Sequence, residues 1–425
     1  MHALGADQPT VLGALKALGD EVVAIGTASA PQYTLRDPSR ADLQVLVHGV
    51  TAEGQRQARG ILVPVCPQGF VMAQTDGKKL YSEGLPWWLF DMRPQGYLGR
   101  AYHQRHGAHL GLPTHLEEWS DRHILQALLH QGEDLPGHLL LGDAGHDRFI
   151  HAPAPVPITA ARPQAYADLA AAAERGELPG PLVGGEQPKF TAFVQPEGEP
   201  AAHVIVKFSA SVDNPTSQRW RDLLLAEHTA LQVLNDGGIV AARTNLIDHG
   251  VQRFLEVQRF DRVGALGRRG LHSLAALDAE FAGSGGRWPE VARTLARERI
   301  IPPEAVEGAC LLWAFGTLIG NTDMHSGNLS FLSEHGRLYQ LAPAYDMTPM
   351  AFAPTAAGEL PERLLALHVG EQVPARIWLR ALPLAQEFVR RLQAASGLSP
   401  GFAPCMAALQ QHMALAAVRI GRPVG

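Results

Sequence analysis

The chain has 425 residues, of which 46% are hydrophobic and 18% are charged, and its formal net charge is −6. This length predicts two or three domains, and the composition is that of a globular protein without a disorder signature. The net charge gives no general electrostatic reason to bind nucleic acid or an acidic membrane surface. Three well-separated cysteines, no signal-peptide pattern and no apolar run of about 20 residues predict a cytoplasmic protein that contacts no membrane.

Residues 1–40 predict a short helix followed by a β-hairpin. Pro9 stands where a first helical turn tolerates proline, and the helix that follows places Val11, Leu15 and Leu18 on one face. The chain then reads as strand, flexible tip and strand. Helix and hairpin resemble the second half of a winged helix, in which the helix could contact DNA. The charges of this segment form no basic patch, so a docking module is the other interpretation.

Residues 41–150 alternate strand-like runs with helical ones and predict a small α/β subdomain. The segment GLPWWLFDMRPQGYLG (residues 84–99) combines two tryptophans with several turn formers, so we expect an ordered, packed loop. A stretch rich in proline and alanine, residues 151–163, is expected to be a linker. Residues 151–260 would then form a strand-rich lobe, and residues 261–425 a mostly helical lobe.

The polar stretch GNTDMHSGNLSFL (residues 320–332) directly follows an apolar helix expected over residues 304–319. Within it, Asp323 and Asn328 are separated by four residues, the D-x-x-x-x-N spacing at which protein kinases place a catalytic base and a metal-binding amide. A strand-like run over residues 338–347 follows and carries Tyr345 and Asp346 near its end. One carboxylate would orient the attacking hydroxyl, while the amide oxygen and the second carboxylate would hold a hard cation such as Mg²⁺.

An upstream half suited to ATP precedes this loop in the required order. The glycine-containing turn LVGGEQPKFTAFV (residues 182–194) opens into a strand and could place backbone N–H groups over phosphates. Lys207, in the alternating strand HVIVKFS, would bind phosphates, and Glu227, in a helix expected over residues 221–234, could pair with it. The strand FLEVQRF (residues 254–260) would be a hinge whose backbone bonds the adenine.

The order of these motifs resembles the HipA-like serine/threonine kinases, the toxin family of bacterial type II toxin–antitoxin systems. The resemblance is carried by GGEQPKF, VIVKF, VQRFDR, IGNTDMHSGN and LAPAYD, and it is closest to the longer, YjjJ-like subgroup. It implies an α+β fold: a protein-kinase-like two-lobed body, an N-terminal α/β subdomain and a short winged-helix-like N-terminus. It also implies ATP and Mg²⁺ as cofactors.

By this resemblance, Asp323 would be the catalytic base, and Asn328 and Asp346 would be the Mg²⁺ ligands. The residues expected around the nucleotide are Gly184, Gly185, Gln187, Lys189, Lys207, Glu227, Gln258, Arg259, Phe260, His325 and Tyr345. The substrate would be a protein hydroxyl, and the effect growth arrest through a translation-related target. An antitoxin is an expected partner, and DNA could be bound through the N-terminal segment.

One departure from the family concerns regulation. Family members commonly carry a serine before the glycine turn, and autophosphorylation of that serine silences the kinase. The corresponding stretch here, LPGPLVGG (residues 178–185), contains no serine. We therefore expect this switch to be absent.

Other interpretations of the same residues stay open. Asp323 could cap a turn, Lys207 could be a strand lysine with its ammonium in solvent, and Glu227 could face water. The arginines of residues 261–272 are expected in a solvated loop. No HxH or HExxH spacing is present, which argues against zinc. The alternative functions are a small-molecule phosphotransferase, a DNA-binding regulator with an inactive kinase-like body, and a toxin-like partner-binding protein that is silenced by a cognate antitoxin.

Overall fold

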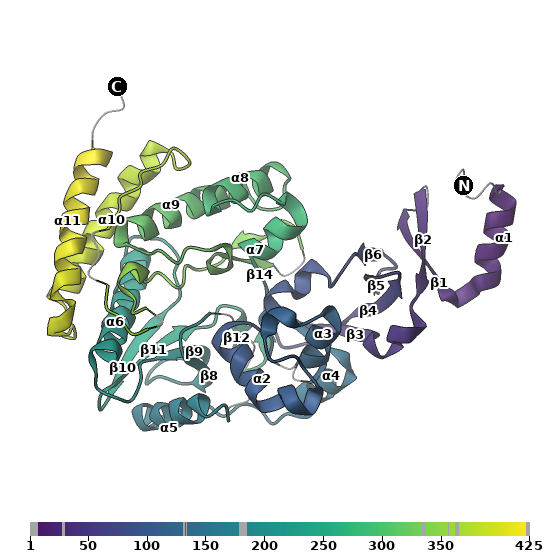
Figure 1. Ribbon diagram of the computed structural model, residues 1–425, viewed down its shortest axis with the longest axis horizontal. Helices are drawn as coiled ribbons and strands as arrows, with labels where there is room; N and C mark the ends of the chain where they lie inside the picture. Colours follow the sequence, from purple (N-terminus) through teal and green to yellow (C-terminus); the bar gives the residue numbers. More distant parts are fainter. Residues whose placement is uncertain are drawn as a thin grey trace.

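The computed structural model describes residues 7–27, 30–130, 132, 134–177, 185–333, 336–355, 357–361 and 365–421. Figure 1 shows an elongated molecule in which the N-terminal helix and the C-terminal helices lie at opposite ends. Between them lie a mostly antiparallel sheet with its helices and a body made of a smaller sheet and a helical lobe (Figure 1). Among the described residues we find no helix whose length and hydropathy would let it span a bilayer.

The N-terminal segment folds into the helix and hairpin that its sequence predicts. α1 (Gln8–Leu18) starts after Asp7, whose side chain accepts a hydrogen bond from the backbone N–H of Thr10 at 3.0 Å. β1 (Val22–Thr27) and β2 (Ala30–Arg36) pair antiparallel. β2 also pairs with β4 of the next unit, so the hairpin is the edge of a larger sheet rather than a separate wing.

The middle unit is a sheet with helices packed on it. The sheet runs in the order β1-β2-β4-β3-β7, and β5 pairs with both β4 and β6. Its further strands are β3 (Val45–Val50), β4 (Arg56–Cys66), β5 (Phe70–Gln74), β6 (Lys79–Ser82) and β7 (Leu139–Leu141). The helices are α2 (Gly96–Leu110), α3 (Asp121–His130) and α4 (Gly142–His151). A shared core joins sheet and helices and includes Leu62, Phe70, Leu125, Leu128 and Leu141.

The segment expected as an ordered loop is partly helical. Trp87–Met92 forms a 3-10 helix, η4, and α2 begins already at Gly96. Glycine and proline lower helix propensity, so the composition of the segment hides this helix start. Trp87 packs against His272 of the body, with ring centroids 4.8 Å apart. The segment therefore joins two parts of the molecule.

A four-stranded antiparallel sheet in the order β10-β11-β9-β8 forms the small lobe of the body. Its strands are β8 (Lys189–Val194), β9 (Ala202–Phe208), β10 (Thr244–His249) and β11 (Gln252–Gln258). α5 (Arg162–Glu174) and α6 (Pro215–Asp236) pack against this sheet. α6 begins before the expected residue 221, at a capping box in which Asn214 and Ser217 exchange hydrogen bonds. The linker expected over residues 151–163 is shorter, because α4 extends to His151 and α5 begins at Arg162.

Two arginines of the segment after β11 are buried, although residues 264–266 between them are exposed, which corrects the expectation of a solvated arginine loop over residues 261–272. It contains the short strands β12 (Arg262–Val263), β13 (Gly267–Arg268) and β14 (Gly270–Ser273). Arg262 and Arg268 are only 8% and 6% exposed. Arg262 binds the carboxylates of Asp261 and Asp134 at 2.8 and 2.6 Å. These carboxylates compensate for the desolvation of the guanidinium, and Asp134 is too distant along the chain for the sequence to reveal the pairing.

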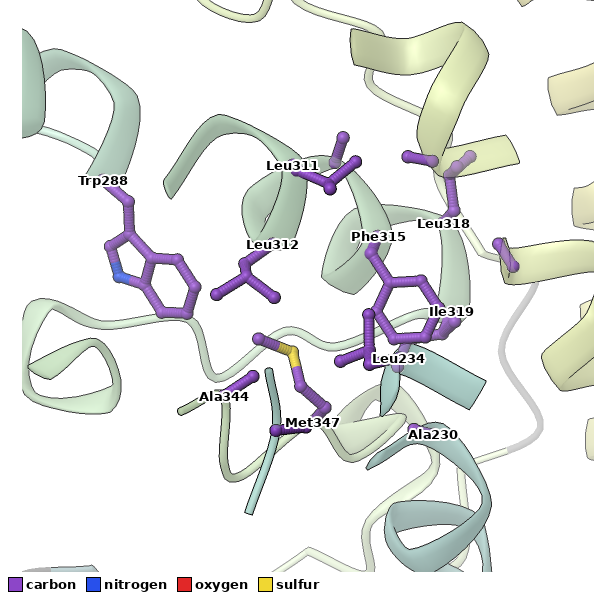
Figure 2. Close-up of a cluster of buried hydrophobic side chains, with 14 of the residues drawn as sticks. Ala230, Leu234, Trp288, Leu311, Leu312, Phe315, Leu318, Ile319, Ala344 and Met347 are labelled. Atoms are coloured by element: carbon purple, nitrogen blue, oxygen red, sulfur yellow. The ribbon is translucent and has the colours of Figure 1, made fainter. Parts of the chain in front are cut away.

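The helical lobe is built around α9. Its helices are α7 (Leu274–Leu277), α8 (Trp288–Arg297), α9 (Pro303–Ile319), α10 (Ala375–Ala394) and α11 (Ala403–Ile420). Figure 2 shows side chains of α9 packing near residues from α6, α8 and the segment that carries Asp346. The residues are Leu311, Leu312, Phe315, Leu234, Trp288 and Met347. This dense packing fixes the position at which α9 ends.

The strand-like run over residues 338–347 forms a shorter strand than its alternating pattern predicts. β14 pairs with β15 (Ser330–Ser333), and β15 pairs with β16, which covers only Gln340–Leu341. Beyond β16, Ala344 forms an isolated parallel bridge with Ala241 of the small lobe. The chain thus leaves one lobe for the other directly before Asp346.

Candidate active site

The end of α9 begins the polar loop. Gly320 ends the helix with φ +80°, a left-handed conformation that glycine adopts without a steric penalty. Asn321 follows, and its Nδ2 donates to the backbone O of Asp346 at 3.1 Å while its Oδ1 accepts from the N–H of Asp323 at 3.0 Å. Asn321 therefore ties together the two segments that carry the aspartates. This role was not predicted, although its place directly after the helix-ending glycine is a usable signal.

The loop from Asp323 to Asn328 folds back on itself. Asn328 Nδ2 donates to the backbone O of Asp323 at 2.8 Å, while Asn328 Oδ1 has no hydrogen bond among the described residues. His325 Nδ1 accepts from the N–H of Gly327 at 3.0 Å and caps the turn between them. Desolvation raises the pKa of Asp323, an effect that His325 opposes. The loop therefore carries two oxygen groups that could take part in catalysis, the carboxylate of Asp323 and the amide oxygen of Asn328.

Lys207 on β9 lies at the centre of the site. Its Nζ lies 2.7 and 2.9 Å from the carboxylate oxygens of Glu227 on α6, and it also contacts Oδ1 of Asp346. Lys207 and Glu227 are only 7% and 1% exposed. Burial alone would lower the pKa of Lys207, but Asp346 and Glu227 outweigh it and hold the pKa above its usual value. Glu227 therefore faces this charged lysine rather than water.

Asp346 adopts φ +53°, which is uncommon for a residue that carries a side chain. Asn321 binds its backbone O and Lys207 binds its carboxylate. Burial would raise the pKa of Asp346, but Lys207 and Lys189 hold it below its usual value. The carboxylate is thus ionised at neutral pH. Unusual backbone conformations held by surrounding contacts are frequent at functional sites.

These side chains line one cavity of about 350 Å³. Its polar residues include Lys189, Lys207, Asn328 and Asp346, and its apolar residues include Ile205, Val257, Phe260 and Leu271. Gly185, His325 and Tyr345 also line the cavity, and the ring of Tyr345 lies 5.6 Å from that of Phe260. Glu227 lies behind Lys207, and Asp323 stands outside the cavity wall on the loop that carries Asn328. The cavity therefore combines charged groups with an apolar slot.

The expected hinge lines the cavity, but most of its backbone donors are already in use. The N–H of Gln258 donates to Arg243 O at 2.9 Å, and the N–H of Arg259 donates to His203 O at 2.8 Å. Of the three hinge residues, only Phe260 has an N–H with no partner among the described residues. Phe260 is therefore the one residue of these three whose backbone N–H could donate a hydrogen bond to an adenine.

The side chain of Arg259 has another partner. It binds the carboxylates of Asp134 and Asp261 at 3.1 and 3.0 Å, and Asp261 in turn accepts from the N–H of Gly137 at 2.9 Å. Burial would raise the pKa of Asp134, but Arg259 and Arg262 lower it to about 2. This ionic network joins the hinge to the middle unit, so a nucleotide contact by Arg259 would involve its backbone alone.

Only the end of the glycine turn can be placed, because Gly184 and the rest of residues 178–184 lie outside the described residues. Gly185 has φ +96°, and a Cβ at this position would lie 2.5 Å from Nζ of Lys189. Lys189 is 4% exposed, and burial lowers its pKa to about 8 although Asp346 opposes the shift. Gln187 is half-buried in the turn before β8 and does not line the cavity.

Asn328 and Asp346 are the residues that fit a magnesium ion. The free amide oxygen of Asn328 and the ionised carboxylate of Asp346 are hard oxygen ligands on the same cavity. Mg²⁺ is usually held by one or two protein oxygens together with phosphates and water. Within the described ranges, no group of three or more His, Cys, Asp or Glu side chains could hold a metal ion.

Four of the lining residues that were not predicted come from a part of the chain outside the two lobes. Phe90, Asp91, Gln95 and Pro136 all belong to the middle unit. The tryptophans and turn formers of residues 84–99 predicted an ordered, packed segment, but nothing in the sequence indicated what it packs against.

Two family models match the chain. The model described as "YjjJ-like toxin, middle domain" matches residues 41–150, and the model described as "HipA-like C-terminal domain" matches residues 182–413. The protein "Toxin YjjJ" of Escherichia coli (strain K12) is 40% identical over 380 residues, which cover 88% of this chain and 85% of that protein.

Solved structures resemble the chain at low sequence identity. The complex of HipA, HipB and operator DNA from Shewanella oneidensis MR-1 matches with a TM-score of 0.57 and 16% identity, over 88% of this chain and 97% of that chain. The proinflammatory kinase CtkA of Helicobacter pylori matches with a TM-score of 0.40 and 16% identity, over 56% and 93%. With the sheet order and helical lobe described above, the first of these confirms the α+β, protein-kinase-like fold expected from the sequence.

Proposed function

The chain belongs to the family of HipA-like toxins, and from this membership we propose that it is an ATP- and Mg²⁺-dependent protein kinase. The reaction is transfer of the γ-phosphoryl group of ATP to a serine or threonine hydroxyl of a protein. Its biological effect is growth arrest through a translation-related target.

The observation that carries this proposal is the position of Lys207 between Glu227 and Asp346. Protein kinases require a strand lysine paired with a helix glutamate, together with a metal-binding aspartate, before phosphoryl transfer can occur. Here β9 and the segment after β16 supply Lys207 and Asp346 to one cavity, and α6 supplies Glu227 behind Lys207. The D-x-x-x-x-N loop brings Asn328 to the same cavity.

In the proposed mechanism, Asp323 orients the attacking hydroxyl and accepts its proton. Lys207 and Lys189 attract the phosphates, and Asn328 and Asp346 hold the metal. Bound Mg²⁺–ATP would supply the transferable phosphoryl group and the positive charge that neutralises it. The low exposure of Lys207 strengthens its electrostatic attraction, because little water screens it.

The remaining nucleotide contacts are assigned on the same basis. The Phe260 N–H and the apolar Ile205 and Val257 would receive the adenine, and His325 and Tyr345 would complete the wall beneath it. Gly184 and Gly185 would lie over the phosphates. Gln187 would take part only if the turn closes over a bound nucleotide, because the side chain does not line the cavity.

The proposed partners follow from the family. One relative is named a toxin, and the Shewanella HipA was solved with HipB and operator DNA, which supports an antitoxin or DNA as partner. We propose four functional units, with DNA binding assigned to the first and catalysis shared by the last two. These units are a partial winged-helix-like segment (1–40), a middle subdomain (41–150), a small lobe (151–260) and a helical lobe (261–425).

The test is incubation of purified protein with γ-labelled ATP, Mg²⁺ and a cell lysate that contains proteins and metabolites. We expect label in a protein band for the wild type, with phosphoserine or phosphothreonine found by mass spectrometry. Asp323→Asn should lower transfer by at least about 100-fold, as expected for loss of a general base. Label in small molecules alone would instead favour a small-molecule phosphotransferase. Equal transfer by the variant would refute the role of Asp323.

A further inference from the structure

The middle unit reaches the candidate nucleotide cavity through three separate segments. Phe90 and Asp91 belong to η4, Gln95 caps the start of α2, and Pro136 lies just before β7. A cavity formed only between two kinase lobes would contain none of these side chains. The middle unit is therefore a third wall of the cavity.

Each segment is held by a contact to a part of the body that also borders the cavity. The N–H of Tyr97 donates to Gly185 O at 3.0 Å, at the end of the glycine turn. The N–H of Ser273 donates to Asp91 Oδ2 at 2.6 Å, at the start of α7. The N–H of Gly137 donates to Asp261 beside the hinge. The third wall is thus positioned by hydrogen bonds at both ends of the cavity.

Asp91 is the only titratable side chain that this wall contributes among the described lining residues. Burial raises the pKa of this carboxyl, and the hydrogen bond from Ser273 opposes the shift. Its Oδ2 is occupied by Ser273, whereas its Oδ1 has no hydrogen bond among the described residues. Among the residues that line the same cavity, Phe90, Phe260 and Leu271 are apolar. The two lysines and the candidate metal ligands come from β8, β9 and the loop regions around Asn328 and Asp346. An anionic phosphate would be repelled by Asp91, but an uncharged O–H or N–H donor would be attracted.

The geometry points to Asp91 as a residue that recognises the nucleoside: its Oδ1 accepts a hydrogen bond from a ribose hydroxyl or from the 6-amino group of adenine. This inference rests on the proposed function, because it requires ATP in this cavity. An ionised carboxylate can only accept, and the ribose hydroxyls and the 6-amino group are the hydrogen-bond donors that the nucleoside offers. Nucleotide selectivity would then depend on the middle unit as well as on the kinase body.

The experiment measures dissociation constants by calorimetry for ATP, 2′-deoxyATP, 3′-deoxyATP and purine riboside triphosphate, which lacks the 6-amino group. We expect the wild type to bind the analogue that lacks the contacted donor about tenfold more weakly than ATP, as for loss of one charge-assisted hydrogen bond. In Asp91→Asn one oxygen must serve both Ser273 and the nucleoside, so this difference should shrink to about twofold or less. The analogue that shows the effect identifies the donor.

Asp121→Asn is the matched control. Asp121 also accepts a hydrogen bond from a backbone N–H, that of Leu85 at 3.1 Å, and it is half-buried in the same unit but does not line the cavity. It should bind all four nucleotides as the wild type does. Unchanged discrimination in Asp91→Asn would overturn the inference while leaving the kinase proposal intact. No ATP binding by the wild type would instead overturn the proposed function itself.

Discussion

Lys189 and Lys207 both line the cavity, but their surroundings shift their pKa values in opposite directions. Lys207 contacts two carboxylates and has a raised pKa, whereas burial dominates at Lys189 and lowers its pKa to about 8. The order of motifs indicated that Lys207 would bind phosphates, but the strand pattern left open whether its ammonium faces solvent. The sequence left the direction of Glu227 open, because only the fold shows that α6 turns it toward β9. The lowered pKa of Lys189 was not predictable, since it depends on burial beneath Gly185.

ATP affinity should therefore decrease as the pH rises through about 8. The folded protein loses the Lys189 proton near this pH, and phosphates bind the protonated form more tightly. The dissociation constant should rise by up to about tenfold per pH unit above this value. Lys207 should not contribute, because its pKa is raised. Calorimetric titrations between pH 7 and 9.5 measure this slope. Lys189→Met should bind ATP more weakly with a nearly flat profile, and an unchanged slope in that variant would assign the titration to another group.

α9 was predicted within one residue of its start, because apolar spacing and a helix-ending glycine are both local signals. Elements whose boundaries depend on distant partners were predicted less well. Of the strand expected over residues 338–347, only β16 forms. The bridge between Ala344 and Ala241 directs the following residues away from β15. The buried β12–β13 hairpin was missed because Asp134, which neutralises its arginines, lies far away in sequence.

Gly320→Ala should disturb both stability and activity. A residue with a Cβ pays about 1–2 kcal/mol in the left-handed conformation, and this Cβ would lie 3.1 Å from Cδ1 of Leu365. Urea unfolding should show that loss, and label transfer should fall because Asn321 and Asp323 follow directly.

Gly283→Ala provides the comparison for this variant. Gly283 has φ +60°, and a Cβ there would meet nothing within 4 Å. The backbone penalty should be similar, but label transfer should be retained. Equal loss of transfer in both variants would show that the effect arises from stability rather than from the position of the loop.

The order of motifs along the chain predicted the architecture of the whole molecule: an N-terminal helix and hairpin, a middle unit and a two-lobed body (Figure 1). Motif order could not predict that the middle unit borders the nucleotide cavity, because that contact is purely spatial. Arg262 is central to this junction. It donates to Gly137 O at 2.8 Å and to Leu135 O at 2.7 Å, in addition to its two carboxylate partners.

Arg262→Met should weaken the contact between the middle unit and the body. Because the middle unit borders the cavity, the same variant should also bind ATP more weakly. Removing one partner from a buried ionic network costs about 3–5 kcal/mol, so thermal unfolding should occur at a clearly lower temperature. The stabilisation produced by saturating ATP should also be smaller than in the wild type. Arg122→Met, which breaks the exposed pair with Asp42, should cost at most about 1 kcal/mol and leave ATP binding unchanged. Full ATP stabilisation in Arg262→Met would mean that the junction and the cavity are independent.

The most direct test of the account is the Mg²⁺ dependence of ATP binding, measured by calorimetry in the wild type and in Asp346→Asn. If Asn328 and Asp346 hold the metal, Mg²⁺ should strengthen ATP binding to the wild type by at least about tenfold and should have little effect on the variant. Without Mg²⁺, the variant should bind ATP at least as tightly as the wild type, because a carboxylate near the phosphates is gone. The same Mg²⁺ dependence in both proteins would contradict the assignment of this cavity as the catalytic metal–nucleotide site.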